Sequence, residues 1–160
     1  MPDQRINAIH YSELPPGLAL PAYDLGKDVI SCDQAAAAKG IPLANELKTI
    51  ILSTKVGETV GICAVSLPGD RQVSLRKVKR FLKVNQASLA PLTELHRIGL
   101  SPGTVCPVLD PVWSLPQLVS AAVFTLEFVS TNNNTQSRFL RFPPHLLLQA
   151  RNIQVGEFEK

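Results

Sequence analysis

The chain is poor in the residues that build metal sites and disulfide frameworks. Its 160 residues include 3 cysteines and 3 histidines. The cysteines are odd in number, far apart and without a Cys-x-x-Cys motif: Cys32, Cys63 and Cys106. The histidines are equally dispersed: His10, His96 and His145. A disulfide scaffold and a structural zinc site are therefore disfavoured, and we expect neither a metal nor a cofactor.

Long apolar runs are also missing. The longest candidate, residues 118–129, is too short for a membrane span and is interrupted by Glu127. The first five residues are too polar for a signal peptide. With 45% hydrophobic and 18% charged residues and a net charge of +3, the chain has the composition of one globular domain. We expect a soluble, cytoplasmic protein without a membrane partner.

Local patterns in the first half predict a helix followed by a hairpin. Ser31 as a polar cap, the alanine-rich residues 34–39 and Gly40 as a stop predict a short helix. Two apolar, β-branched runs at 46–52 and 59–67 are separated by a turn and predict a hairpin with largely buried strands. Before them, residues 18–25 are typical of an edge strand because Pro21 cannot donate to a sheet.

The second half predicts shorter elements. Ser74 caps a helix over 75–84, whose residues Leu75, Val78, Phe81 and Leu82 have helical spacing and should face the core. Further patterns predict helices at 90–97 and 145–151, strands at 105–109, 120–130 and 138–142, and a loosely attached tail from 152. Together these elements predict a mixed α+β fold.

Acidic residues are absent where the cations gather. Between Asp70 and Glu94 stand six of the sixteen Lys and Arg residues and no acid: Arg71, Arg76, Lys77, Lys79, Arg80 and Lys83. A solvated helix face is one interpretation. A single-sign patch also favours a polyanionic partner such as nucleic acid, since faces kept only for solubility usually mix signs.

Two other features have both a structural and a functional interpretation. Lys48 opens a strand expected to be buried, where a lysine usually extends its ammonium to solvent, or stands at the lip of a pocket to meet an anionic or carbonyl oxygen. Two glycines and two prolines alternate at residues 99–107 and make a stiff loop. Such a loop turns a corner or presents backbone N–H groups to a ligand oxygen.

The order of these features resembles the YbaK/prolyl-tRNA-synthetase-associated domain family. The shared features are Gly-Ile-Pro after the alanine-rich helix, Lys48-Thr49 opening a strand, a Pro-Gly-Asp turn, a basic helix and a Gly-x-x-x-Pro loop at 103–107. The resemblance implies a curved mixed sheet forming a distorted barrel surrounded by short helices. It implies a single domain over 1–160, with an N-terminal extension (1–25), an editing-like domain (26–151) and a tail (152–160).

The resemblance also implies a function: a free-standing aminoacyl-tRNA deacylase that hydrolyses the ester of a mischarged tRNA. It assigns catalysis to Lys48 and Gly103. It assigns substrate binding to five further residues: Thr49, Thr104, Val105, Cys106 and Pro107. The partner would be aminoacylated tRNA, with an aminoacyl-tRNA synthetase as a second candidate. An activated ester requires positioning and oxyanion stabilisation more than a strong nucleophile. The neighbours of Cys106 are apolar, so we expect its thiol to pack rather than to act as a nucleophile.

Two other functions stay open. One is a non-catalytic relative that binds tRNA or a synthetase, and the other is an unrelated small-molecule-binding α/β domain. Many family members carry a glycine and often an acidic residue near the last hairpin, where residues 130–135 read Ser-Thr-Asn-Asn-Asn-Thr. The sequence therefore does not name the amino acid that would be removed.

Overall fold

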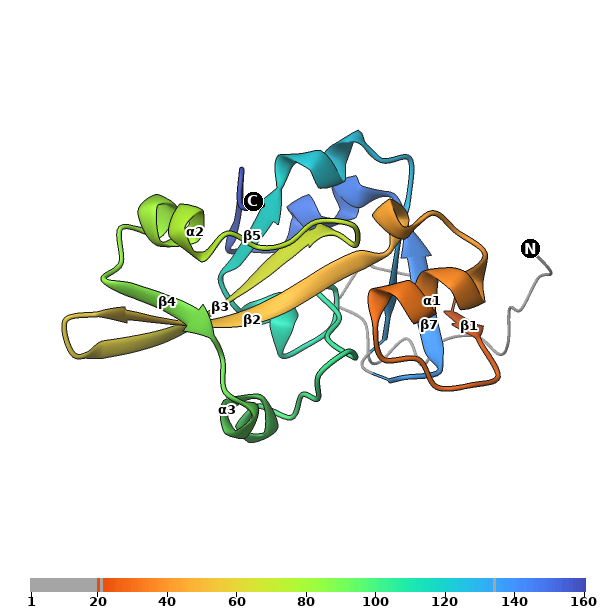
Figure 1. The fold of residues 1–160 in the computed structure, drawn as a ribbon, viewed down its shortest axis with the longest axis horizontal. Coiled ribbons are helices and arrows are strands. Elements are labelled where there is room, and N and C mark those ends of the chain that lie inside the picture. Colours follow the sequence, from red (N-terminus) through yellow and green to blue (C-terminus); the bar gives the residue numbers. More distant parts are fainter. Residues whose placement is uncertain (1–19, 21, 134) are drawn as a thin grey trace.

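Two sheets organise the chain (Figure 1). The computed structural model describes residues 20, 22–133 and 135–160. The strands are β1 (Ala22–Asp24), β2 (Leu47–Val56), β3 (Thr59–Pro68), β4 (Gln86–Leu89), β5 (Gln117–Ser120), β6 (Val129–Asn132), β7 (Arg138–Phe142) and β8 (Ile153–Gly156). The helices are α1 (Cys32–Lys39), α2 (Leu75–Leu82) and α3 (Leu92–Arg97), with short 3-10 helices η2 (Leu43–Asn45), η3 (Val112–Ser114), η4 (Ala121–Thr125) and η5 (Pro144–Gln149).

The larger sheet has five strands in the order β4-β2-β3-β5-β8, and the smaller has three in the order β1-β7-β6. An isolated parallel bridge between Glu46 and Ser130 connects the start of β2 to β6, and hence one sheet to the other. The predicted mixed α+β fold is confirmed. No closed barrel is found among the described strands, which pair as two sheets.

Helix α1 forms where its caps predict it. The Ser31 side chain accepts a hydrogen bond from the Gln34 backbone N–H, and the Gln34 side chain accepts one from the Ser31 N–H, which completes a capping box. Gly40 ends the helix in the left-handed region at φ 68°. Because the caps satisfy the free backbone groups, this eight-residue helix is well defined at both ends.

The predicted hairpin is confirmed as β2 and β3, which pair antiparallel from Leu47↔Pro68 to Val56↔Thr59. Its base is buried, but its tip projects into solvent, where Val56 and Val60 are exposed. The prediction of two largely buried strands therefore holds only for the half of the hairpin near the core. Strand β4 pairs with the outer edge of β2, and β5 pairs parallel to β3.

Two predicted elements are wrong. Residues 105–109 form turns rather than a strand, although Cys106, Val108 and Leu109 are buried, because Pro107 has no N–H for a ladder. Residues 120–130 do not form one strand, because the Ser120 hydroxyl accepts from the Ala122 N–H and starts η4 between β5 and β6. The last predicted helix, over 145–151, is present as the 3-10 helix η5, which begins one residue earlier and ends two residues earlier.

The tail is not loosely attached. Residues of β8 pair parallel to β5, and the ring of Phe158 is fully buried beside Phe81, with ring centroids 5.0 Å apart. The Phe158 carbonyl accepts from the Ser74 N–H at 2.7 Å. The tail thus supports α2, which ends at Leu82 rather than 84 because Lys83 takes a left-handed conformation. Phe81, predicted to face the core, is 41% exposed.

The described part of the N-terminal segment includes an edge strand. Strand β1 lies at the edge of the three-stranded sheet, as predicted for an edge strand near Pro21. Residues 1–19 and 21, which include most of the predicted extension, lie outside the described residues. In the part of the chain that the structure describes, no helix is long and apolar enough to cross a membrane.

Candidate functional site

A cavity of about 220 Å³ opens where four segments far apart in the sequence meet. The segments are the start of α1, the start of β2, the loop at Gly103 and the end of β6. The polar residues that line it are Ser31, Glu46, Lys48, Thr49, Thr131 and Asn132. The cavity is small for a ligand pocket and therefore fits a small group rather than an extended molecule.

Some of the predicted site residues meet in this cavity, and others do not. Lys48, Thr49, Gly103 and Val105 all line it. The other three predicted loop residues are not among its lining: Thr104, Cys106 and Pro107. The Thr104 hydroxyl donates to the Ser101 carbonyl at 2.8 Å. Cys106 and Pro107 are buried at the end of the loop, where the Pro107 carbonyl accepts from Gln117 Nε2 at 3.1 Å.

Lys48 combines the two interpretations that its sequence position left open. Its side chain is half-buried, and its Nζ donates to the Arg71 carbonyl at 2.6 Å, next to the turn that precedes α2. This contact directs the ammonium toward that turn, while the Lys48 side chain lines both the cavity and a neighbouring hollow. An ammonium carries three N–H donors, so this one hydrogen bond leaves donors for a ligand oxygen.

Gly103 is required by close packing. It has φ 78°, and a Cβ at this position would lie 2.5 Å from the Ile30 carbonyl oxygen. Such a distance is far inside van der Waals contact, and the left-handed backbone is also strained for other residues. The glycine therefore lets the loop press against the residue just before the α1 cap and close one wall of the cavity.

The cysteines have the properties of packing residues. Complete burial raises the pKa of Cys106 to about 12, and burial raises that of Cys63 to about 11. A thiol with such a pKa holds almost no thiolate at neutral pH, and the thiolate is the nucleophile. Cys32 lines the cavity, and burial together with the Glu46 charge raises its pKa.

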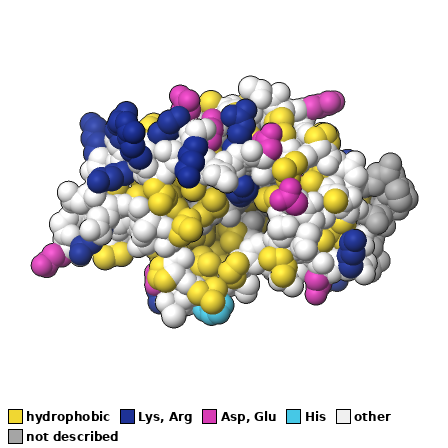
Figure 2. Space-filling model, viewed as in Figure 1, with side chains coloured by type: hydrophobic (Ala, Val, Ile, Leu, Met, Phe, Trp, Pro, Cys, Tyr) yellow, Lys and Arg dark blue, Asp and Glu magenta, His cyan; other side chains and the backbone are white. Residues whose placement is uncertain are grey.

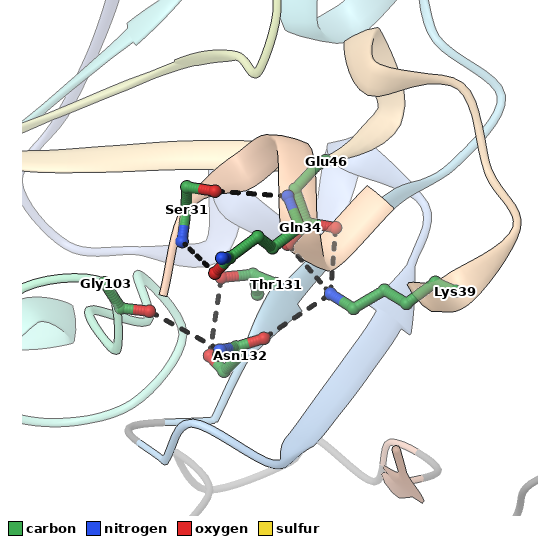
Figure 3. A network of polar contacts seen from close by, with 7 residues as sticks. All are labelled: Ser31, Gln34, Lys39, Glu46, Gly103, Thr131 and Asn132. Atoms are coloured by element: carbon green, nitrogen blue, oxygen red, sulfur yellow. Dashed lines mark hydrogen bonds and ion pairs between the residues drawn. The ribbon is translucent and has the colours of Figure 1, made fainter. Parts of the chain in front are cut away.

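Sequence reasoning missed a buried ion pair behind the cavity (Figure 3). Lys39 is 0% exposed and its Nζ lies 2.8 Å from both carboxylate oxygens of Glu46. The same ammonium lies 3.5 Å from Asn132 Oδ1 and 4.5 Å from the Phe139 ring centroid. Burial lowers the pKa of Lys39 and raises that of Glu46, while the opposite charge of each partner acts against these shifts.

Asn132 connects this ion pair to the loop. Its Nδ2 donates to the Gly103 carbonyl at 3.4 Å, so that one amide contacts both the buried ammonium and the loop backbone (Figure 3). The only sequence signal was a pair of opposite charges seven residues apart across a turn. That spacing does not indicate burial, because lysine and glutamate side chains are mostly exposed in proteins.

The basic residues gather over α2 and the turn before it (Figure 2). Lys77 is half-buried and pairs with Glu157 at 3.4 Å, and Arg71 lies 3.7 Å from Asp70. Four other cations are exposed and make no ion pair with a described residue: Arg76, Lys79, Arg80 and Lys83. This surface therefore carries a local excess of positive charge.

An apolar groove connects this basic surface to the cavity. Lys48 and Ile50 line both the cavity and an adjoining hollow of about 410 Å³, whose walls include Val73, Leu89 and Leu75, the first residue of α2. Hydrophobic side chains lie in the central hollow below the basic surface in Figure 2. The path from α2 to the cavity is thus open and apolar at its floor.

Among the residues that the structure describes, no group of three or more His, Cys, Asp or Glu side chains could hold a metal ion. The polar cavity residues are instead hydroxyls, an amide, an ammonium and a carboxylate already paired with Lys39. Their chemistry is that of hydrogen bonding and charge stabilisation.

Solved structures of similar fold agree with this architecture. A structure provisionally named a trans-editing enzyme for prolyl tRNA synthetase aligns with a TM-score of 0.75 at 22% identity, over 88% of this chain and 87% of that chain. A hypothetical protein aligns with a TM-score of 0.78 at 23% identity, over 90% and 93%. At these identities the likeness shows the fold.

Sequence comparisons extend to curated proteins and to a family model. The chain is 30% identical over 73 residues to a proline–tRNA ligase of Chlamydia caviae and 33% identical over 67 residues to one of Chlamydia trachomatis serovar A. These matches cover 45% and 41% of the chain but only 13% and 12% of the ligases. The model of the aminoacyl-tRNA editing domain matches residues 27–149. The chain therefore belongs to the aminoacyl-tRNA editing domain family.

Proposed function

We propose that the protein is an aminoacyl-tRNA deacylase that acts in trans on a mischarged tRNA. The observation that carries this proposal is the convergence of Lys48, Thr49 and Gly103 on one small cavity, although Gly103 lies 54 and 55 positions after Thr49 and Lys48 in the sequence. The family and the trans-editing name of a structural neighbour support the same function.

The residues present suit ester hydrolysis. Water attacks the ester carbonyl carbon, a new C–O bond forms, and the carbonyl oxygen becomes an oxyanion. The ester C–O bond to the ribose then breaks, and the ribose hydroxyl leaves with a proton that the water supplied. The products are the free amino acid and the uncharged tRNA. The catalytic requirement is a donor set for the oxyanion and a fixed orientation of the ester.

Lys48 and the loop supply such donors. The Lys48 side chain lines the cavity and carries N–H donors beyond the one on the Arg71 carbonyl, and the backbone N–H groups of Gly103 and Val105 have no hydrogen-bond partner among the described residues. A cation and free N–H groups around one cavity favour a developing negative charge over a neutral carbonyl. Thr49 is less free, because its hydroxyl lies 2.9 Å from that of Ser66.

We expect the basic surface on α2 to hold the tRNA backbone. Helix α2, which carries the four unpaired cations, contributes Leu75 to the wall of the apolar groove that leads to the cavity, and basic side chains gather above the hollow in Figure 2. Phosphates bound over α2 would leave an unpaired 3′ end to follow the groove, where apolar side chains contact bases.

The test is a panel of tRNAs, each charged with a non-cognate amino acid and incubated with the purified protein. We expect at least one ester to be hydrolysed, and Lys48→Ala to lower kcat/KM by roughly 10²- to 10³-fold, the usual loss of one oxyanion donor. Lys55→Ala is the matched control, because Lys55 lies on the same strand but is exposed at the hairpin tip. It should keep wild-type kinetics.

Two measurements separate catalysis from folding and from binding. Urea unfolding should give Lys48→Ala and Lys55→Ala free energies of unfolding within about 1 kcal/mol of the wild type. If the wild type leaves the whole panel intact yet binds tRNA, the deacylase proposal is wrong and the protein is a binding relative. An active Lys48→Ala variant would remove the lysine from the mechanism.

A further inference from the structure

We propose that the amino acid removed carries a small, hydroxyl-bearing side chain, and that Glu46 and Asn132 recognise the hydroxyl. This inference rests on the deacylase function proposed above. It concerns the inner wall of the cavity, where Glu46, Thr131 and Asn132 bring polar groups.

These three residues are deeply buried: Glu46 is 3% exposed, Thr131 2% and Asn132 5%. Polar groups in such a place are costly unless they are hydrogen-bonded, so an apolar substrate that covered them would displace water without replacing its hydrogen bonds. The wall therefore favours a ligand that brings hydrogen-bonding groups of its own.

Asn132 keeps hydrogen-bonding capacity for such a ligand. Its two contacts, from Nδ2 to the Gly103 carbonyl at 3.4 Å and from Lys39 Nζ to its Oδ1 at 3.5 Å, are both longer than typical hydrogen bonds. An amide also has two N–H donors and two acceptor lone pairs, so one N–H and one lone pair stay available. Glu46 also keeps hydrogen-bonding capacity. A carboxylate accepts about four hydrogen bonds, and both oxygens of Glu46 contact the same Lys39 ammonium, so lone pairs stay available for a ligand.

A hydroxyl matches this pair of groups. It can donate to the Glu46 carboxylate and at the same time accept from Asn132 Nδ2, whereas a methyl group can do neither. A carboxylate side chain would be repelled by Glu46. An ammonium side chain would compete with Lys39, which already lies 2.8 Å from that carboxylate.

The position of the polar groups narrows the class further. The cavity has a volume of about 220 Å³, and the Asn132 amide in its wall also donates to the Gly103 carbonyl, so this amide lies beside the loop that would hold the ester. A hydroxyl that reaches both the amide and Glu46 must therefore lie close to the ester carbonyl. Serine and threonine carry their hydroxyl on Cβ, at such a short distance, whereas the hydroxyl of tyrosine is separated from the carbonyl by the ring.

The experiment charges one tRNA in turn with two matched pairs of amino acids. Threonine and valine differ by a hydroxyl in place of a methyl, and serine and alanine by a hydroxyl in place of a hydrogen. We expect kcat/KM to be higher for threonine than for valine, and for serine than for alanine, by about 100-fold or more, because a site built for a hydroxyl strongly rejects analogues that lack it. Equal or reversed rates within both pairs would overturn the inference and leave the deacylase function standing. If none of the four esters nor any other is hydrolysed, the proposed function fails and the inference with it.

Variants identify the residues that recognise the hydroxyl. Asn132→Leu should reduce the threonine-to-valine ratio at least about 10-fold, since the shape is kept and the amide is lost. Asn45→Leu is the matched control, because Asn45 also donates from Nδ2 to a backbone carbonyl, that of Phe128, but does not line the cavity. It should leave the ratio unchanged.

A second variant replaces the ion pair with apolar residues of similar size, Lys39→Met with Glu46→Leu, which avoids an unpaired buried charge. We expect this double variant to hydrolyse the valine ester faster relative to the threonine ester than the wild type does. A purely structural role of the pair would lower both rates together and leave the ratio at its wild-type value. That outcome would remove Glu46 from substrate recognition.

Discussion

The buried Lys39–Glu46 pair allows a sharp prediction about stability. Both side chains are almost completely buried, at 0% and 4% exposure, and their charges lie 2.8 Å apart. Desolvation opposes both charges, as the lowered pKa of Lys39 and the raised pKa of Glu46 indicate. We therefore expect the pair to matter strongly when it is broken and little when it is replaced as a whole.

The perturbation is a double-mutant cycle with Lys39→Met, Glu46→Leu and the combined variant. Each single substitution leaves a buried charge without its partner, and should lower the free energy of unfolding by about 3–5 kcal/mol. The combined variant should lie within about 1 kcal/mol of the wild type, or be more stable, since it removes both desolvation costs. The coupling between the two positions should thus exceed about 3 kcal/mol.

Urea denaturation followed by circular dichroism measures these values. With a slope of about 2 kcal/mol per molar urea, a loss of 3 kcal/mol shifts the midpoint by about 1.5 M, well above the error of the method. Additive single effects, or a combined variant as unstable as the sum of the singles, would refute the reasoning.

The pH dependence gives an independent check. The folded pKa of Lys39 lies below its unfolded value of 10.5, so the folded state releases this proton first and the penalty is relieved as pH rises toward 10.5. The folded pKa of Glu46 lies above 4.5, so the folded state binds this proton first and the penalty is relieved as pH falls toward 4.5. Relative to the apolar double variant, wild-type stability should therefore be lowest near neutral pH. A difference that is flat from pH 5 to 10 would contradict the assigned shifts.

Three further predictions concern other parts of the molecule. The combined variant Arg76→Glu, Lys79→Glu and Lys83→Glu should bind tRNA at least about 10-fold more weakly at low salt and with a weaker salt dependence. The measurement is the Kd as a function of KCl concentration. An unchanged affinity would show that α2 does not bind the tRNA. Cys106→Ala should keep kcat/KM within about twofold and cost about 1–2 kcal/mol of stability, whereas a nucleophilic role would abolish turnover. Gly103→Ala should lower both stability, by about 1–3 kcal/mol, and deacylation, because its Cβ would meet the Ile30 carbonyl; normal turnover would show that the loop tolerates the change.

Elements with strong local signals were predictable from the sequence. The caps of α1 and α2 and the β-branched runs of β2 and β3 determine structure over a few residues, and the structure follows them. The short strands β5 and β8 were not predicted, because their parallel pairing joins residues 36 positions apart and four-residue strands carry little periodicity. A buried segment without regular structure, such as the one around Cys106, is also apolar, so its sequence resembles that of a buried strand.

The site was predictable to the extent that its residues belong to motifs. Lys48 and Gly103 stand in recognisable motifs and meet in the cavity. Glu46 and Asn132 stand in no motif, and they become neighbours only because the bridge from Glu46 to Ser130 joins the two sheets beside the loop. Lys39 was hidden for the same reason, since its partner is set by tertiary packing rather than by spacing along α1.

The attachment of α2 has a consequence for how the protein is made. Three contacts from residues 157–158 hold this helix: the Phe158 ring against Phe81, the Phe158 carbonyl on the Ser74 N–H, and Glu157 on Lys77. Residues 75–82 are therefore synthesised long before the segment that supports them. A chain that ends before residue 157 keeps the core contact of Val78 but lacks these three, so we expect the position of α2 to become fully fixed only when the final segment has paired with β5.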